Sequence, residues 1–177
     1  MRPIVLASVL AVLALPALAQ ERTERRSPAQ PVPAAELEAR LLNAHNAARR
    51  EVGVPDLVWS PVLADQARVW AWTLARSGRF EHDTERGAVG ENLWTGWGRR
   101  FSPEEMIQAW AGERQAYVHG AFPDVRRPGD TRAVGHYTQM VWRSTTQVGC
   151  ALAEHDGRQF LACRYSPPGN VRGQTAY

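Results

Sequence analysis

Residues 148–165 read VGCALAEHDGRQFLACRY, and this stretch predicts a β-hairpin. Runs of alternating character over 148–153 and 159–165 flank Asp156-Gly157, a dipeptide typical of two-residue hairpin loops. Counting outward from that loop places Cys150 opposite Cys163, in a non-hydrogen-bonded pair whose Cα atoms should lie about 4.5 Å apart. That separation suits a disulfide, which we expect in an exported chain; two free buried thiols are the alternative.

Three helices are predicted before this hairpin. The first starts at Ala34 and ends near Gly53, with inward positions at Leu37, Leu41, His45, Ala48 and Val52. The second starts at Ser60-Pro61, an N-cap followed by proline, and stops at Gly78. The third starts with the capping box Ser102-Pro103-Glu104-Glu105, and its inward stripe holds Met106, Trp110, Glu113 and Tyr117.

Two further segments complete the predicted elements. Residues 91–95 are expected to form a strand, and 135–142 either a short helix or an extended run. Helices combined with a short antiparallel sheet indicate an α+β fold.

The composition is that of one globular domain. Of the 177 residues, 44% are hydrophobic and 22% are charged, which argues against a disordered chain or a coiled-coil rod. All 21 basic residues are arginine, yet the formal net charge is only +3. Because no basic stripe interleaved with aromatic residues is present, the sequence argues against a nucleic-acid partner.

The N-terminus predicts export. Arg2, an apolar run over 4–15 and Ala17-Leu18-Ala19 form the pattern of a signal peptide over residues 1–19. Residues 20–33 hold three prolines and are predicted to be a linker, which leaves residues 34–177 as a single domain. No later segment is apolar enough to span a bilayer, so we expect a secreted or periplasmic protein.

Four ionisable residues stand out because their neighbours are apolar or glycine: His82, Glu91, Glu113 and His136. Each alone is explained as well by an arginine-paired carboxylate or a core histidine. The sequence has no H-E-x-x-H, G-x-S-x-G or phosphate-binding glycine motif, and bridged cysteines could not serve as nucleophiles. The seven tryptophans could line a sugar or lipid groove, although such residues more often fill a core.

Four stretches, in the same order, resemble the CAP superfamily, which comprises the cysteine-rich secretory proteins, antigen 5 and the plant pathogenesis-related 1 proteins. Residues 135–145 (GHYTQMVWRST) and 160–171 (FLACRYSPPGNV) are similar to its two signature stretches. Residues 42–49 (LNAHNAAR) are similar to its opening helix, and 90–93 (GENL) to its central motif. The similarity covers about 34–177, although this chain has one cysteine pair where many members have several.

The resemblance implies an α-β-α sandwich with a surface cleft, in which two histidines and two glutamates converge and several members bind Zn²⁺ or another divalent cation. Matched motif by motif, these residues are His136, Glu91, Glu113 and His82. Structural roles are expected in the opening helix for His45, Asn46 and Arg49.

From these residues we expect a weak, exchangeable divalent metal site. The two imidazoles are the expected ligands, with the glutamates orienting them or a bound water. An ordinary imidazole protonates near pH ~6.5, so such a site loses metal on acidification.

The resemblance further implies a secreted module that binds a sterol or another lipid, or an extracellular partner. The alternative is a metal-dependent hydrolase in which Glu91 and Glu113 are the catalytic candidates. A third possibility is a scaffold whose cleft has lost its function.

Overall fold

The computed structural model describes residues 33–177. The predicted signal peptide and all of the predicted linker except Pro33 lie outside the described residues. None of the helices within 33–177 combines the length and the hydrophobicity that crossing a bilayer requires.

A four-stranded sheet forms the middle of the domain. Its strands are β1 (Val58–Trp59), β2 (Gly90–Trp97), β3 (Gln147–His155) and β4 (Arg158–Ser166), in the spatial order β1-β3-β4-β2. Only β1 runs parallel to its neighbour, β3; the other pairings are antiparallel. The last two strands of the chain therefore lie at the centre of the sheet.

The predicted hairpin and its disulfide are confirmed. Cys150 pairs with Cys163 in the β3–β4 register and is bonded to it, with Cα atoms 4.0 Å apart. Asp156 and Gly157 form the loop and both have positive φ, 50° and 72°, the backbone that favours Asp-Gly in such loops.

The helices begin where the sequence predicts. They are α1 (Ala34–Glu51), α2 (Pro61–Ser77), α3 (Pro103–Ala111) and the short α4 (Gly135–Met140). Ser60 caps α2, Gly78 ends it in the left-handed region, and Ser102 and Glu105 form both bonds of a capping box. Residues 135–140 form the helix of the two alternatives left open by the sequence.

One helix boundary differs from the prediction. The third helix ends at Ala111, so Glu113 lies in the following 3-10 turn, η1 (Gly112–Gln115), and not on α3 itself. The Glu113 side chain is nevertheless mostly buried, because the tighter turn continues along the inward side of the helix.

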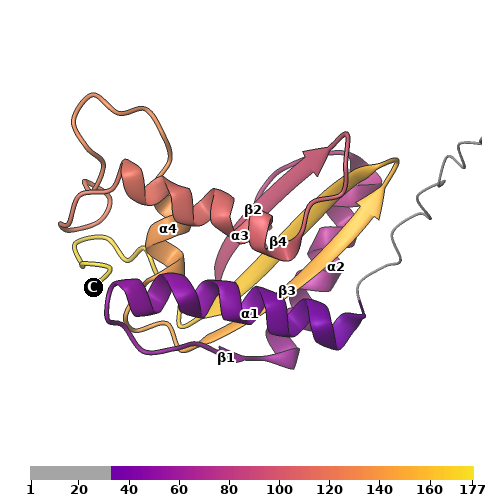
Figure 1. The fold of residues 1–177 in the computed structure, drawn as a ribbon, viewed down its shortest axis with the longest axis horizontal. Helices are drawn as coiled ribbons and strands as arrows, with labels where there is room; N and C mark the ends of the chain where they lie inside the picture. Colours follow the sequence, from indigo (N-terminus) through magenta and orange to yellow (C-terminus); the bar gives the residue numbers. More distant parts are fainter. Residues whose placement is uncertain (1–32) are drawn as a thin grey trace, which may run out of the picture. The chain divides into compact units, whose positions relative to one another are not determined.

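The layers form the expected α-β-α sandwich (Figure 1), with α1 in front of the sheet and α2 behind it. The core behind the sheet is small and rich in alanine, and includes Ala67, Ala71 and Phe160. The core in front is larger and includes Met106, Trp110, Trp142 and Tyr165. The candidate site lies at the N-terminal ends of β2 and α4, where the GENL and GHYTQM stretches begin.

Candidate functional site

The first pair of candidate residues joins the loop after α2 to the edge strand β2. The Nδ1 atom of His82 lies 2.5 Å from Oε1 of Glu91. The Glu91 side chain is wholly buried, whereas 56% of the His82 side chain is exposed. The carboxylate therefore fixes one ring nitrogen from inside, while the rest of the imidazole faces solvent.

A buried arginine lies behind this pair. Arg164 on β4 is opposite Glu91 in the sheet register, and its Nη1 lies 2.8 Å from Glu91 Oε2. Its Nη2 donates a hydrogen bond of 2.7 Å to Oδ2 of Asp83, the residue after His82. The backbone N–H of Asp83 in turn donates to Glu91 Oε1 at 3.2 Å.

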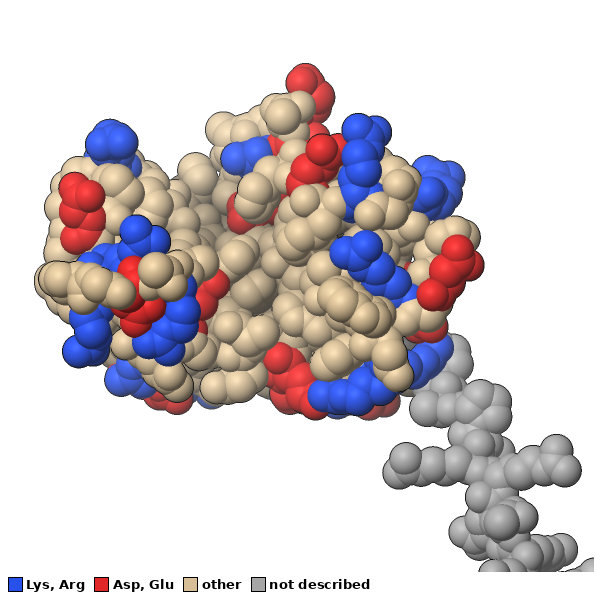
Figure 2. Space-filling view, turned by 90° about the horizontal axis from the view of Figure 1, so that it is seen from above, with Lys and Arg blue, Asp and Glu red and all other residues tan. Residues whose placement is uncertain are grey.

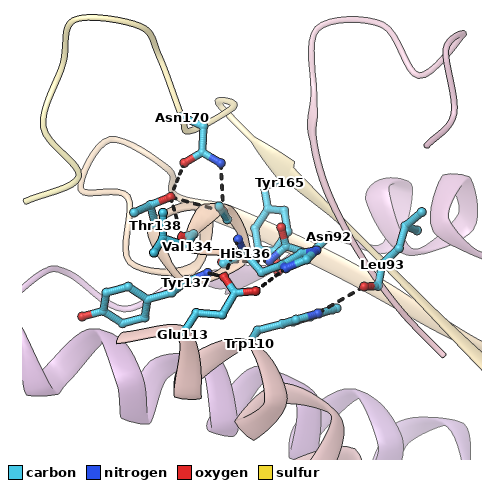
Figure 3. A network of polar contacts seen from close by, with 11 residues as sticks. Asn92, Leu93, Trp110, Glu113, Val134, His136, Tyr137, Thr138, Tyr165 and Asn170 are labelled. Atoms are coloured by element: carbon cyan, nitrogen blue, oxygen red, sulfur yellow. Dashed lines mark hydrogen bonds and ion pairs between the residues drawn. The ribbon is translucent and has the colours of Figure 1, made fainter. Parts of the chain in front are cut away.

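The second pair joins η1 to the start of α4 (Figure 3). Oε1 of Glu113 lies 2.6 Å from Nδ1 of His136. Its Oε2 accepts the backbone N–H groups of His136 and Tyr137, at 3.0 and 3.1 Å. The ring of Trp110 stacks on the His136 ring at 5.9 Å, with 16° between the planes. Because N–H groups in the first turn of a helix lack partners within the helix, the carboxylate both satisfies them and orients the imidazole.

Asn92, next to Glu91, connects the two pairs. Its Nδ2 donates to the backbone oxygen of His136 at 3.0 Å and to the Tyr165 hydroxyl at 3.2 Å, as Figure 3 shows. Successive residues of a strand point to opposite faces, so Glu91 faces Arg164 while Asn92 faces Tyr165. The two His–Glu pairs are thus attached to β2 from its two sides.

The Tyr165 hydroxyl continues this chain of hydrogen bonds to His45 on α1. Nδ1 of His45 lies 2.8 Å from the Leu41 carbonyl, which can only accept, so Nδ1 carries the proton and Nε2 accepts from Tyr165 at 2.8 Å. Burial lowers the pKa of His45 to about 4, and the nearby Arg49 charge acts in the same direction, against the bond to Leu41. Burial also raises the pKa of the Tyr165 hydroxyl. Both side chains stay neutral, and their role is to hold the elements of the site together.

The other two residues of the opening-helix motif are buried and bind backbone groups. Asn46 exchanges two hydrogen bonds with the backbone of Leu57. The guanidinium of Arg49 donates to four carbonyls, those of Pro55, Met140, Trp142 and Thr145. The loop that follows α4 is therefore attached to α1 through one side chain.

The four candidate residues form two pairs rather than one tight cluster. Within residues 33–177, no three of them bring ligand atoms within 4.8 Å of one another. Among the described residues, three others do lie this close together: His45, Cys150 and Cys163. They are not available to a metal, because the two sulfurs are bonded to each other and both His45 nitrogens have hydrogen-bond partners. Nε2 of His82 and of His136 has no hydrogen-bond partner among the described residues. Figure 2 shows that the face seen from above is hollowed near its middle, with acidic groups at the margin.

Sequence reasoning did not single out Asp83, Asn92 or Arg164. The available signals were an acid directly after His82, and a charged residue inside an otherwise apolar strand, between Cys163 and Tyr165. Asn92 was visible only as part of the GENL stretch.

A separate hollow of about 550 Å³ lies between α1 and α3–η1. Ion pairs between Arg40 and Glu104, and between Arg114 and Glu51, join the two sides of this hollow. Residues 40 and 51 are eleven positions apart on α1, which corresponds to about 16 Å along a helix. The apolar part of the lining between them consists of Ala44, Ala47, Ala48, Ile107, Ala111 and Tyr137.

This fold is that of a CAP-domain protein. The profile described as "CAP: Cysteine-rich secretory protein family" matches residues 42–165, and the chain belongs to this family. It is 38% identical to pathogenesis-related protein 1A of Nicotiana tabacum over 137 residues, which cover 77% of this chain and 78% of that protein. It is 34% identical to pathogenesis-related protein 1 of Arabidopsis thaliana over 152 residues, which cover 83% and 86% of the two chains.

Solved structures agree on the fold. The "Crystal structure of NaASP2 with Zn2+" matches with a TM-score of 0.66 and 24% identity, covering 80% of this chain and 84% of that one. The "Structure of BmVAL-1" matches with a TM-score of 0.67 and 24% identity, covering 85% of each chain.

Proposed function

We propose that the protein is an exported binding protein that holds a divalent cation, with Zn²⁺ the best fit, through Nε2 of His82 and Nε2 of His136. The observation that carries this proposal is that Nδ1 of each histidine already faces a glutamate carboxylate, at 2.5 and 2.6 Å. In metal sites, a carboxylate on one ring nitrogen fixes the tautomer and makes the other nitrogen a better ligand. The Zn²⁺ of the NaASP2 crystal structure belongs to that protein and supports the choice of probe.

The cation would be held weakly. Two imidazoles leave most of a tetrahedral zinc shell to water or to another ligand, whereas structural zinc sites use four protein ligands. When bound, the cation would offer Lewis acidity and an exchangeable position at the surface. The protein's own contribution is to orient the two rings.

The positions of the carboxylates favour binding over hydrolysis. Glu113 accepts three N–H groups, one from the ring and two from the backbone, and Glu91 is buried between His82 and Arg164. A general base needs an oxygen that can reach a water or substrate proton, and here those oxygens are already engaged. The metal-dependent hydrolase is therefore the second candidate.

We further propose that the hollow between α1 and α3–η1 takes a small apolar ligand, a sterol or another lipid. Its volume of about 550 Å³ suits such a molecule, and alanines, Ile107 and Tyr137 supply an apolar lining. The ion pairs at Arg40–Glu104 and Arg114–Glu51 offer polar contacts for a hydroxyl or carboxyl group. Export is supported by the N-terminal pattern, the disulfide and the secretory family.

Titration calorimetry with ZnCl₂ tests the metal site. We expect the wild-type chain to bind Zn²⁺, and His82→Ala and His136→Ala each to weaken binding by about ten-fold or more. His155→Ala is the matched control, because His155 is exposed on the hairpin and pairs only with Asp156. Equal binding by the wild-type chain and both site variants would exclude this site.

The lipid and hydrolase proposals need separate assays. Retention of sterols and fatty acids should be lost in Ala44→Trp, a change at a half-buried position that lines the hollow, and kept in Ala39→Trp, a change at an exposed position of the same helix outside the lining. Equal retention by both variants would place the ligand elsewhere. Casein cleavage that EDTA stops and Glu113→Gln abolishes would instead establish the hydrolase.

A further inference from the structure

The buried ion cluster behind His82 suggests a role beyond packing. Arg164 lies at the centre of the sheet with a relative exposure of 1%, and its fork reaches two acids on different segments. One is Glu91 on β2 and the other is Asp83 in the loop before it, at 2.8 and 2.7 Å. Arg164 is therefore the common partner of the residue that orients His82 and of the residue that follows His82.

These contacts determine where the His82 loop meets the sheet. Glu91 Oε1 faces both the His82 ring at 2.5 Å and the Asp83 backbone N–H at 3.2 Å. Around Asp83 the loop closes on itself, because Oδ1 accepts the Glu85 N–H at 2.9 Å and the carbonyl accepts Arg86 at 2.6 Å. Without Arg164, two carboxylates would face each other with no cation between them.

We propose that Arg164 and Asp83 are positioning residues for His82: together they hold Glu91 and the loop in the register that directs Nε2 of His82 outward. This inference rests on the proposed cation site and names residues of this chain that control it. Arginine suits the position because its planar fork can hold two carboxylates at a fixed angle, which the single ammonium of lysine cannot do.

Two other roles for Arg164 make different predictions. If Arg164 only stabilises the fold, its replacement lowers the melting temperature and leaves the cation affinity of the folded protein unchanged. If Arg164 acts only through its charge, its removal makes the surroundings more negative and tightens cation binding. A positioning role requires binding to weaken even when the charge is kept.

The experiment compares Arg164→Lys and Asp83→Asn with the wild-type chain, with Arg68→Lys as control. Arg68 forms an exposed pair with Asp65 on α2, so it receives the same substitution away from the site. ZnCl₂ titrations are made well below each melting temperature, and ¹⁵N NMR of the metal-free protein follows the His82 ring nitrogens. Asp83→Asn keeps the side-chain shape but removes a negative charge, so if Arg164→Lys does not fold, the His82 ring signals of Asp83→Asn decide the question and its affinity does not.

We expect Arg164→Lys and Asp83→Asn each to bind Zn²⁺ about ten-fold more weakly and to lose the NMR signature of a hydrogen-bonded His82 Nδ1, while the control changes neither. Unchanged or tighter binding by folded variants would overturn the inference. If the wild-type chain itself binds no Zn²⁺, the proposed function fails. The NMR comparison then decides the positioning role alone: a retained Nδ1 signature overturns it and a lost one supports it.

Discussion

Acidification should destabilise the protein through His45, a buried residue of α1 that is hydrogen-bonded to Tyr165. Its pKa falls to about 4 in the folded state, whereas an unfolded histidine has a pKa near ~6.5. Between these two pH values His45 binds a proton in the unfolded chain but not in the folded chain. The contribution of neutral His45 to the free energy of unfolding is therefore fully present above pH ~6.5 and is lost as the pH decreases toward 4. At 1.36 kcal/mol per pKa unit, the loss is about 3 kcal/mol.

Urea unfolding at pH 7 and pH 4 measures this loss as the difference between the two free energies of unfolding. The same pair of measurements on His45→Gln removes the titrating group, so the variant should lose about 3 kcal/mol less between the two pH values. The difference between the losses of the wild-type chain and the variant is free of the contributions of the other histidines, which are the same in both proteins. Equal pH dependence in the two proteins, or an NMR titration of the His45 ring near pH 6.5 in the folded state, would refute the reasoning.

Three further predictions concern stability and are checked by urea unfolding of purified variants. Gly149→Ala should lower the free energy of unfolding by about 3 kcal/mol or more, because its Cβ would lie 2.2–2.7 Å from the backbone at the start of α2. Gly112→Ala is the control and should change little, since a Cβ there meets open space. Similar losses in the two variants would contradict the close packing of Gly149 against α2. Replacing Cys150 and Cys163 together by alanine should cost about 2–3 kcal/mol, the value for a short closed loop, and no loss would refute this. Ser102→Ala should lower the free energy of unfolding by about 1 kcal/mol, because α3 loses its N-cap. An unchanged urea midpoint would show that the capping box does not stabilise the protein.

Local signals in the sequence were enough for most of the fold. Ser60 and Gly78 mark the ends of α2 through backbone chemistry that needs no distant partner, and Asp156-Gly157 sets the hairpin register in the same way. The end of α3 could not be found this way, since the apolar stripe continues into η1 and only the change of hydrogen bonding separates them. The state of 135–140 depended on a distant residue, because Asn170 bonds to both Gly135 and Thr138.

Less of the candidate site than of the fold could be predicted from the sequence. His82, Glu91, Glu113 and His136 were selected from their surroundings and from the family motifs, and their binding of a cation stays a prediction. Arg164 was missed because its role depends on facing Glu91 across two strands that lie more than sixty residues apart in the chain. No local periodicity encodes such a pairing, whereas the burial of a charged residue within a strand becomes informative once the register is known.

The position of the hairpin in the sheet has a consequence for biosynthesis. β2 pairs only with β4, and α2 packs on β3 and β4. Neither β2 nor α2 can therefore make its native contacts with the sheet before residues 147–166 are present. A nascent chain emerging from the ribosome cannot assemble this sheet until residues 147–166 have been synthesised and released from the exit tunnel. Such late assembly would keep the polypeptide threadable through a translocation pore, and a premature stop before residue 147 would leave the preceding helices without a sheet on which to fold.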